Sequence, residues 1–318
     1  MKKYLLFIPI IVALLIALII SIAMHVDSFE IMTIPRSYSY VSTISDSDEM
    51  DVRVYVSSKN SYITRINGVK NAYIKNSKNT DEVQIKIIDI TDCDIKTKVY
   101  GHTFYLYEFS FDITFPTTSE YELAINDAIL VLEYDSKDIT LELGSFYYYK
   151  TPYYGDSSNN LIVTSLKPVL GYLDENRTVS GIRIGLRNNS NQKITICDIK
   201  LLDPNIYASL GEIKIIEEDI NGLETMSSIL GYNYYLKTKE KDNATINLEI
   251  DKKDEYDLII PLKYLEDYPI NSFGFIISYK EENSDVIVKY YYDDFIFFNS
   301  LKETYDETKI KIATYENN

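Results

Sequence analysis

The sequence predicts an all-β protein with two tandem β-sandwich domains after one N-terminal transmembrane helix. Three observations predict this architecture. A long apolar run opens the chain, short segments alternate apolar with polar residues along most of the remainder, and two sequence patterns recur in the same order. Alternation with a period of two places one face of a strand on a core and the other in water.

The apolar run spans residues 4–24 and contains no charged residue. About 20 apolar residues are enough to cross a membrane as a helix. Lys2 and Lys3 precede the run, so the positive-inside rule predicts a cytoplasmic N-terminus and an extracytoplasmic remainder. We interpret residues 1–27 as a cytoplasmic stub and a signal anchor in the cell membrane. The alternative is a cleaved signal peptide, with small residues at Ser21 and Ala23, which makes the protein secreted.

Five segments show the strand alternation most clearly. They are residues 52–56, 83–87, 140–143, 182–186 and 245–250. Clusters of Asn, Asp, Gly and Ser separate such segments, a pattern typical of antiparallel sandwiches or barrels. Near the end of each domain, residues 128–143 and 275–290 predict a hairpin.

Two recurring patterns predict an internal duplication. The pattern Ile-Thr-x-Cys-Asp-Ile-Lys occurs at 90–96 and 194–200, with an offset of 197 − 93 = 104. Further matches share an offset of 261 − 116 = 145; they pair 112–116 with 257–261, 125–126 with 270–271, and Tyr134 with Tyr279. The difference of 145 − 104 = 41 residues predicts an insertion around 201–250, which a surface loop accommodates at little entropic cost. Chance matching in a chain of biased composition is the alternative.

The stretch 153–160 is the predicted linker, because its small and polar residues favour turns. It separates a first β-sandwich domain, residues 28–155, from a second, residues 156–318. Residues 185–196 read as strand, Asn-rich turn and strand, and this segment resembles a hairpin of the immunoglobulin-like modules of bacterial surface proteins. The resemblance covers about one hairpin and implies two tandem immunoglobulin-like sandwiches rather than barrels.

The residues able to carry chemistry are few. Cys93 and Cys197 occupy equivalent places in the two repeats, a domain length apart, so we expect two free thiols that pack inward as small hydrophobic groups. His102 has no nucleophile elbow or second zinc-ligating His to work with, since His25 lies at the membrane boundary. We therefore assign no catalytic, cofactor-binding or metal-binding residue.

Carboxylates cluster at four places. They are residues 46–51, Asp89 with Asp92 and Asp94, residues 217–219, and Asp293 with Asp294. In a chain with a formal net charge of −16, we interpret them as solvated turns. Calcium binding and glycoside hydrolysis by a carboxylate pair are the alternatives. The negative charge argues against nucleic acid as a partner.

Tyrosine is unusually frequent, with 30 residues and triplets at 147–149 and 290–292. Neighbours along a strand face opposite sides, so we expect at least one Tyr of each triplet to face solvent. Exposed rings can stack on sugars or bind a protein surface. The alternative is that they only cover the sheets.

These observations favour a membrane-anchored extracytoplasmic binding or scaffolding protein that is not an enzyme. Its partner would be a protein or a glycan, and an envelope complex containing it as a subunit is one form of this function. The alternative is an exported carbohydrate-acting enzyme that uses a carboxylate pair. The ligand and the oligomeric state stay open.

Overall fold

The structure is a computed structural model. It describes residues 27–43, 47–76, 82–114, 120–135, 137–153, 155, 159–173, 176–216, 236–270, 272–296, 310 and 312–317. These residues form strands and three short 3-10 turns, at Tyr62–Thr64, Ile66–Gly68 and Leu210–Glu212. The all-β prediction is confirmed. Within these ranges no helix has the length and apolar character needed to span a membrane, and the apolar run at 4–24 lies outside them.

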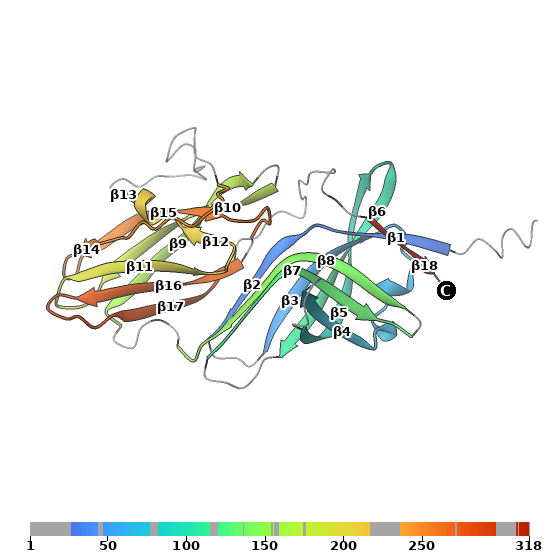
Figure 1. Cartoon of the computed structure of the whole chain (residues 1–318), viewed down its shortest axis with the longest axis horizontal. Coiled ribbons are helices and arrows are strands. Elements are labelled where there is room, and N and C mark those ends of the chain that lie inside the picture. The colour runs from blue at the N-terminus through green and yellow to red at the C-terminus, as the bar shows by residue number, and fades with distance from the viewer. Residues whose placement is uncertain are drawn as a thin grey trace, which may run out of the picture.

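The first unit is built on nine strands. They are β1 (Asp27–Thr33), β2 (Arg36–Ser42), β3 (Ser47–Val56), β4 (Asn71–Asn76), β5 (Glu82–Val99), β6 (His102–Thr114), β7 (Tyr121–Glu133), β8 (Asp138–Lys150) and β18 (Ile312–Asn317). Their order is β18-β1-β3-β6-β5-β4-β7-β8-β2 (Figure 1). All neighbours are antiparallel except β2 and β8, which are parallel.

The nine-stranded sheet folds back on itself at β5. This strand pairs with β4 near its start and with β6 over most of its length, with register shifts after Ile87 and Asp92. Side chains from both halves of the sheet, such as Val52 of β3 and Leu130 of β7, form one buried hydrophobic cluster. The alternation in β3, where Val52 is buried and Arg53 is half-buried, supplies one such face. The result is a sandwich-like layer arrangement around a single core.

The second unit has two facing sheets. Its strands are β9 (Leu161–Leu173), β10 (Asn176–Asn188), β11 (Ile194–Leu202), β12 (Ile206–Ala208), β13 (Lys214–Ile216), β14 (Leu248–Ile250), β15 (Glu255–Tyr264), β16 (Ser272–Glu281) and β17 (Val288–Ile296). One sheet has the order β12-β15-β10-β9, with β13 also pairing with β15, and the other has the order β14-β11-β16-β17. Ile184 of β10 and Phe275 of β16 belong to the one core cluster that both sheets share.

The two recurring sequence patterns lie differently in the fold. The second pattern falls on corresponding strands: Asp112 and Asp257 lie on β6 and β15, and Tyr134 and Tyr279 are both buried beside a terminal hairpin. The heptapeptide falls on strands with different neighbours, since β5 pairs with β4 and β6 whereas β11 pairs with β14 and β16. Alternating Ile and polar residues suit any half-buried strand, so this pattern does not specify a position in the sheet.

The C-terminal strand corrects the predicted domain division. Residues 312–317, which were predicted to belong to the second domain, form β18 and pair antiparallel with β1, from Asp27 opposite Asn317 to Met32 opposite Ile312. Local alternation identifies a strand but not the sheet that it joins, which is the reason for the error. As a consequence, β1 begins and β18 ends at the side of the first unit that faces away from the second unit (Figure 1).

The two units contact each other through buried polar groups. Ser37 Oγ on β2 donates to Asp203 Oδ2 at 2.5 Å and lies 2.8 Å from Ser145 Oγ on β8. Asp203 Oδ1 accepts the backbone N–H of Asn205 at 2.7 Å. All four side chains are buried. Because a buried polar group without a partner is destabilising, this network fixes how β2 meets the second unit.

An apolar contact lies beside that network, and we call it the junction cluster. It consists of Val41, Tyr147, Tyr149, Leu202, Ile276 and Tyr291. These residues come from β2 and β8 of the first unit and from β11, β16 and β17 of the second. The two units are therefore packed together and not merely joined by a linker.

The prediction that one Tyr of each triplet faces solvent is wrong. Tyr147, Tyr148 and Tyr149 are only 2%, 0% and 6% exposed. Tyr148 points into the first core, while its two neighbours belong to the junction cluster. In the second triplet Tyr291 is buried in the same cluster, and the flanking tyrosines pack against the second core. The second face of each strand is covered by the other unit, which period-two alternation cannot reveal.

Candidate binding surface

Three turns meet at the end of the second unit that lies farthest from the first (Figure 1). We call residues 189–193, 251–254 and 282–287 the outer turns; they follow β10, β14 and β16. The backbone joins them directly, because Asn188 N–H donates to the Asp254 carbonyl at 2.9 Å and Glu282 N–H donates to the Lys193 carbonyl at 2.8 Å. The outer turns therefore form one surface.

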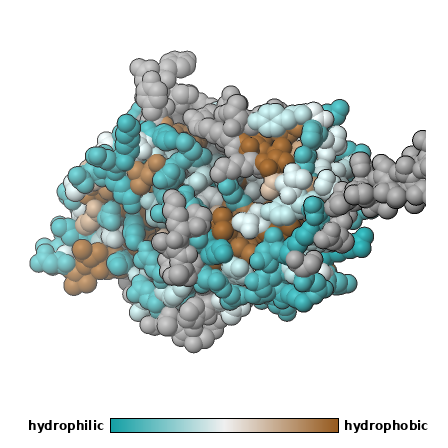
Figure 2. Space-filling view, turned by 45° about the vertical axis from the view of Figure 1, so that its right-hand side comes forward, coloured by the Kyte–Doolittle hydropathy of each residue, from teal (hydrophilic) through white to brown (hydrophobic). Residues whose placement is uncertain are grey.

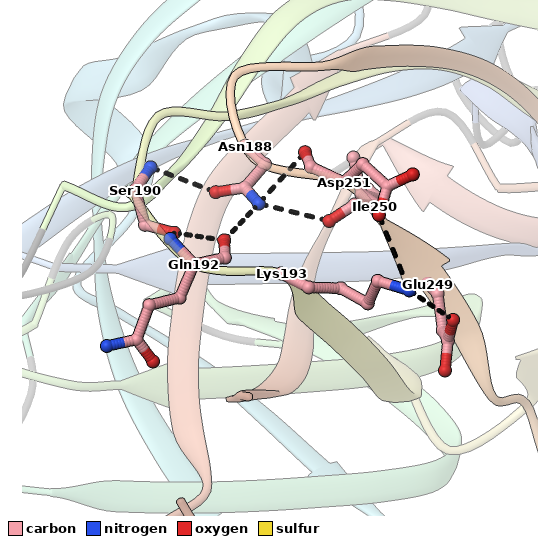
Figure 3. Close-up of polar contacts among 7 residues, drawn as sticks. All are labelled: Asn188, Ser190, Gln192, Lys193, Glu249, Ile250 and Asp251. Atoms are coloured by element: carbon pink, nitrogen blue, oxygen red, sulfur yellow. Dashed lines mark hydrogen bonds and ion pairs between the residues drawn. The ribbon is translucent and has the colours of Figure 1, made fainter. Parts of the chain in front are cut away.

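Asn188 holds two of the outer turns together from beneath (Figure 3). Its side chain is 0% exposed, and Nδ2 donates to the carbonyl oxygens of Gln192, Ile250 and Asp251 at 2.7, 3.0 and 3.1 Å. Its Oδ1 accepts the backbone N–H of Ser190 at 2.9 Å. The carbonyl groups of one turn residue and of two residues at the end of β14 are thereby hydrogen-bonded where no strand pairing is available to them.

On the solvent side, Lys193 of one turn forms ion pairs with two acidic residues at the end of β14. Its Nζ lies 2.9 Å from Glu249 Oε2 and 3.4 Å from Asp251 Oδ1 (Figure 3). The hydrogen bond to Glu249, followed in size by the hydrogen bond to Asp251, raises the pKa of Lys193 above its ordinary value. Because these groups are exposed, the ion pairs orient the side chains more than they stabilise the fold.

Two outer turns contain residues with a left-handed backbone. Lys253 has a φ of 61° and Asn283 a φ of 68°. Positive φ values are uncommon for residues other than Gly, and Asn accepts them better than most. Lys253 also donates through Nζ to the Asn189 carbonyl. These features indicate tight turns with a defined shape.

The third outer turn carries two exposed aliphatic residues. Val286 is 68% exposed and Ile287 is 59% exposed. They are the single pair of sequence neighbours among the exposed large hydrophobic residues of the described ranges. Figure 2 shows a hydrophobic patch among hydrophilic residues at this end of the second unit. Burying such a side chain against a partner is favourable by about 1.5–3 kcal/mol.

This pair was not predicted as a site from the sequence. Val286 was predicted to start the second strand of a hairpin; the hairpin of β16 and β17 is confirmed, but β17 begins only at Val288. A usable signal was present, since Val286, Ile287 and Val288 are three consecutive β-branched residues and break the alternation. One of them had to point away from the core.

The chemically capable residues lie apart from the outer turns. Cys93 and Cys197 are free and half-buried, and each lies at a register shift of its strand. Burial raises the pKa of the Cys93 thiol. His102 Nδ1 lies 2.5 Å from Glu30 Oε2 on the first unit, and His25 lies outside the described residues.

The carboxylate clusters are engaged locally where the structure describes them. Asp51 accepts a hydrogen bond from Ser110 at 2.6 Å, and Asp92 lies 2.6 Å from Lys59 Nζ. Residues 217–219 and the side chains of Asp293 and Asp294 lie outside the described part. Within that part, no group of three or more His, Cys, Asp or Glu residues is placed to hold a metal ion.

Comparisons with known proteins add little to this picture. No protein-family model matches the chain, and no curated protein matches it. One similar solved structure is a protein of unknown function from Porphyromonas gingivalis W83, with 11% identity, a TM-score of 0.19, and coverage of 80% of this chain and 95% of that one. Another is named BspA_C_WT, with 8% identity, a TM-score of 0.18, and coverage of 83% and 98%. Neither likeness carries an argument about function.

Proposed function

We propose that the protein is a membrane-anchored extracytoplasmic binding protein that presents the outer turns of its second unit to a partner. The observation that carries this proposal is the exposure of Val286 and Ile287 on a turn whose neighbours are held by the buried Asn188. Exposed aliphatic groups on a defined surface are typical of interaction sites.

The strand order supports an immunoglobulin-like arrangement for both units. In that fold the first, second and fifth strands form one sheet, and the third, sixth and seventh form the other. The second unit places β9, β10 and β15 together and β11, β16 and β17 together. The first unit has the same neighbours in β1, β3 and β6 and in β4, β7 and β8. End loops of such sandwiches commonly carry binding sites.

The position of β1 supports a role at a membrane. An anchor at residues 4–24 would enter the first unit through β1, at the side away from the second unit. The outer turns would then be the part of the molecule farthest from the membrane. The packed junction between the units would hold them there.

The alternative of a carbohydrate-acting enzyme loses the tyrosine platforms that favoured it. Both triplets are packed against the cores or in the junction cluster. A sugar that stacks on aromatic rings would have to use isolated residues such as Tyr100, Tyr153 or Tyr172. No observation favours this alternative over the binding protein.

Alkaline extraction of membranes tests the anchor. The full chain should stay in the membrane pellet, and a variant with Leu15→Arg and Leu18→Arg in the apolar run should not. Release of the unaltered chain into the supernatant would contradict anchoring.

Co-purification from solubilised membranes tests the binding function. A partner should be recovered with the full chain and lost with Ile287→Asp. Tyr172→Asp is the matched control, because Tyr172 is 63% exposed and lies at the other end of β9 from the outer turns. Recovery of the full chain alone would rule out a subunit of an envelope complex.

A further inference from the structure

We propose that the first unit binds a small aliphatic amino acid in a pocket at the point where β5 leaves β4. This site lies on a different unit from the outer turns, and it goes beyond the proposed function because it needs no macromolecular partner. Three properties of the pocket carry the inference: its place in the sheet, its aliphatic lining and the two opposite charges beside it.

The pocket lies where β5 changes its neighbours in the first unit (Figure 1). Ile85 of β5 is opposite Ala72 of β4, whereas from Lys86 onward β6 is the one strand that pairs with β5 in the described part of the chain. Residues 66–70, which lead from a 3-10 turn into β4, line the pocket together with β5 and the end of β6. The cavity measures about 550 Å³, and small-molecule sites usually measure about 300–1,000 Å³.

Five aliphatic side chains give the pocket its apolar part. They are Ile66, Val69, Ala72, Ile85 and Ile87. Ala72 and Ile85 are buried in the first core, and the other three are half-buried. Among the described residues, no aromatic side chain lines the pocket, so a sugar ring or a nucleobase would find no ring on which to stack. The apolar part therefore suits an aliphatic group.

Two charged side chains at the pocket are available to a ligand. Lys86 of β5 and Asp112 of β6 are directly opposite in the register, so both side chains lie on the same face of the sheet. Neither side chain makes a hydrogen bond or an ion pair with any residue that the structure describes. The other lysine of the pocket, Lys70, is instead paired with Asp135. The pocket thus offers one basic and one acidic group.

These two groups favour a zwitterion. A simple anion would be repelled by Asp112 and a simple cation by Lys86. An α-amino acid carries a carboxylate for Lys86 and an ammonium group for Asp112 on the same carbon atom. The Cβ atoms of directly opposite residues are about 4.5–5.5 Å apart, so both side chains can reach that carbon. The Asn71 amide and the Thr114 hydroxyl also line the pocket without a described partner and can complete the hydrogen bonds.

The edge of β5 beside the pocket favours a small ligand over a peptide strand. The register of β5 with β6 shifts between Ile87 and Asp89, and Ile88 between them is 40% exposed. Such an irregularity twists the edge and interrupts its hydrogen-bonding pattern, which opposes the addition of another strand. The exposed carboxylate of Asp89 opposes it further.

Saturation-transfer nuclear magnetic resonance tests the inference, since it detects weak ligands. The full chain in mild detergent should transfer saturation to leucine, and glycine should bind more weakly because it lacks the aliphatic group. Nα-acetylleucine lacks the ammonium group and leucinamide lacks the carboxylate, so each should bind about tenfold more weakly than leucine. Detergent micelles without protein give the background. Absence of transfer to leucine at millimolar concentration, or equal affinity for all four compounds, would overturn the proposal.

Two variants assign the charges of the ligand to the two side chains. Asp112→Asn should remove most of the preference for leucine over Nα-acetylleucine and keep the preference over leucinamide. Lys86→Met should do the reverse. Lys98→Met is the matched control, because Lys98 is an exposed lysine of β5 that does not line the pocket. Circular dichroism should report the same fold for each variant.

The outcomes are independent of the proposed function. Ile287→Asp alters the second unit and should leave the affinity for leucine unchanged, so failure of one proposal does not imply failure of the other. If Asp112→Asn and Lys86→Met weaken all the leucine derivatives equally, or if Lys98→Met weakens them as much, the two charged groups do not contact the ligand and the assignment is overturned.

Discussion

The second unit has apolar side chains both where it meets the first unit and at its outer turns, and the two places differ in what covers them. At the inner end, where the units meet, Ile276 and Tyr291 from the middle of the hairpin of β16 and β17 are buried in the junction cluster. At the outer end, Val286 and Ile287 are exposed. The same chemistry is satisfied within the chain at one end and left for another molecule at the other. Changes at the inner end should therefore alter stability, and changes at the outer end should alter binding.

The largest effect is expected from truncation inside the junction cluster. Leu202→Ala removes a fully buried side chain and should lower the free energy of unfolding by about 2–5 kcal/mol. Leu186→Ala, in the core of the second unit, is the matched comparison. Urea unfolding of the full chain in mild detergent measures both. A loss below about 1 kcal/mol at Leu202 alone would show that the junction packs less tightly than a core.

Removal of the Asn188 amide should have the next largest effect. Asn188→Ala leaves the Ile250 and Asp251 carbonyls without their donor and should lower the free energy of unfolding by about 1–3 kcal/mol. The neighbouring Asn189→Ala is the control, because Asn189 is exposed and, among the described residues, its side chain makes a single hydrogen bond, of 3.4 Å to the Asn159 carbonyl. Equal losses in both variants would mean that Asn188 does not hold the outer turns.

The buried Asp203 makes the inner end sensitive to pH. Burial raises the pKa of its carboxyl, although hydrogen bonds from Ser37 and Asn205 and the charge of Lys241 act in the opposite direction. The folded chain then holds this proton more tightly than the unfolded chain, so stability should fall as pH rises above about 4, the ordinary value for Asp. Urea unfolding between pH 4 and pH 7 should show that Asp203→Asn removes this part of the slope.

The control for that measurement is Asp198→Asn, an exposed carboxyl on β11, the strand that directly precedes Asp203; this variant reports the slope contributed by the rest of the chain. If Asp203→Asn and Asp198→Asn change the slope equally, the buried carboxyl is not its source.

Strands were predictable from sequence where one face is buried and the other faces solvent, because such strands alternate apolar and polar residues. Residues 52–56 and 140–143 alternate and lie in β3 and β8, because period two is a local property. The partners of a strand are not local: nothing in residues 312–317 indicates that they join β1. Tyr147 and Tyr149 were expected to leave a ring in solvent, and only contact with the second unit buries them.

The candidate site was harder to predict, because it is defined by two apolar side chains that no other part of the described structure buries. Val286 has high strand propensity, and propensity alone extends β17 by two residues too many. Asn188 reads as part of an Asn-rich turn, and its burial follows from the carbonyls of β14, a strand 60 residues further along the chain. Sequence patterning places residues on faces, whereas this surface depends on how three separate turns meet.

The smallest effect on stability is expected at the outer end, and it would complete the comparison. Ile287→Asp replaces a 59% exposed side chain, so the free energy of unfolding should change by no more than about 0.5 kcal/mol. Because the same variant should lose the partner in co-purification from solubilised membranes, it would separate binding from folding at one residue. A loss of stability as large as that of Leu202→Ala would instead mean that Ile287 is covered within the folded chain, and the contrast between the two ends of the second unit would disappear.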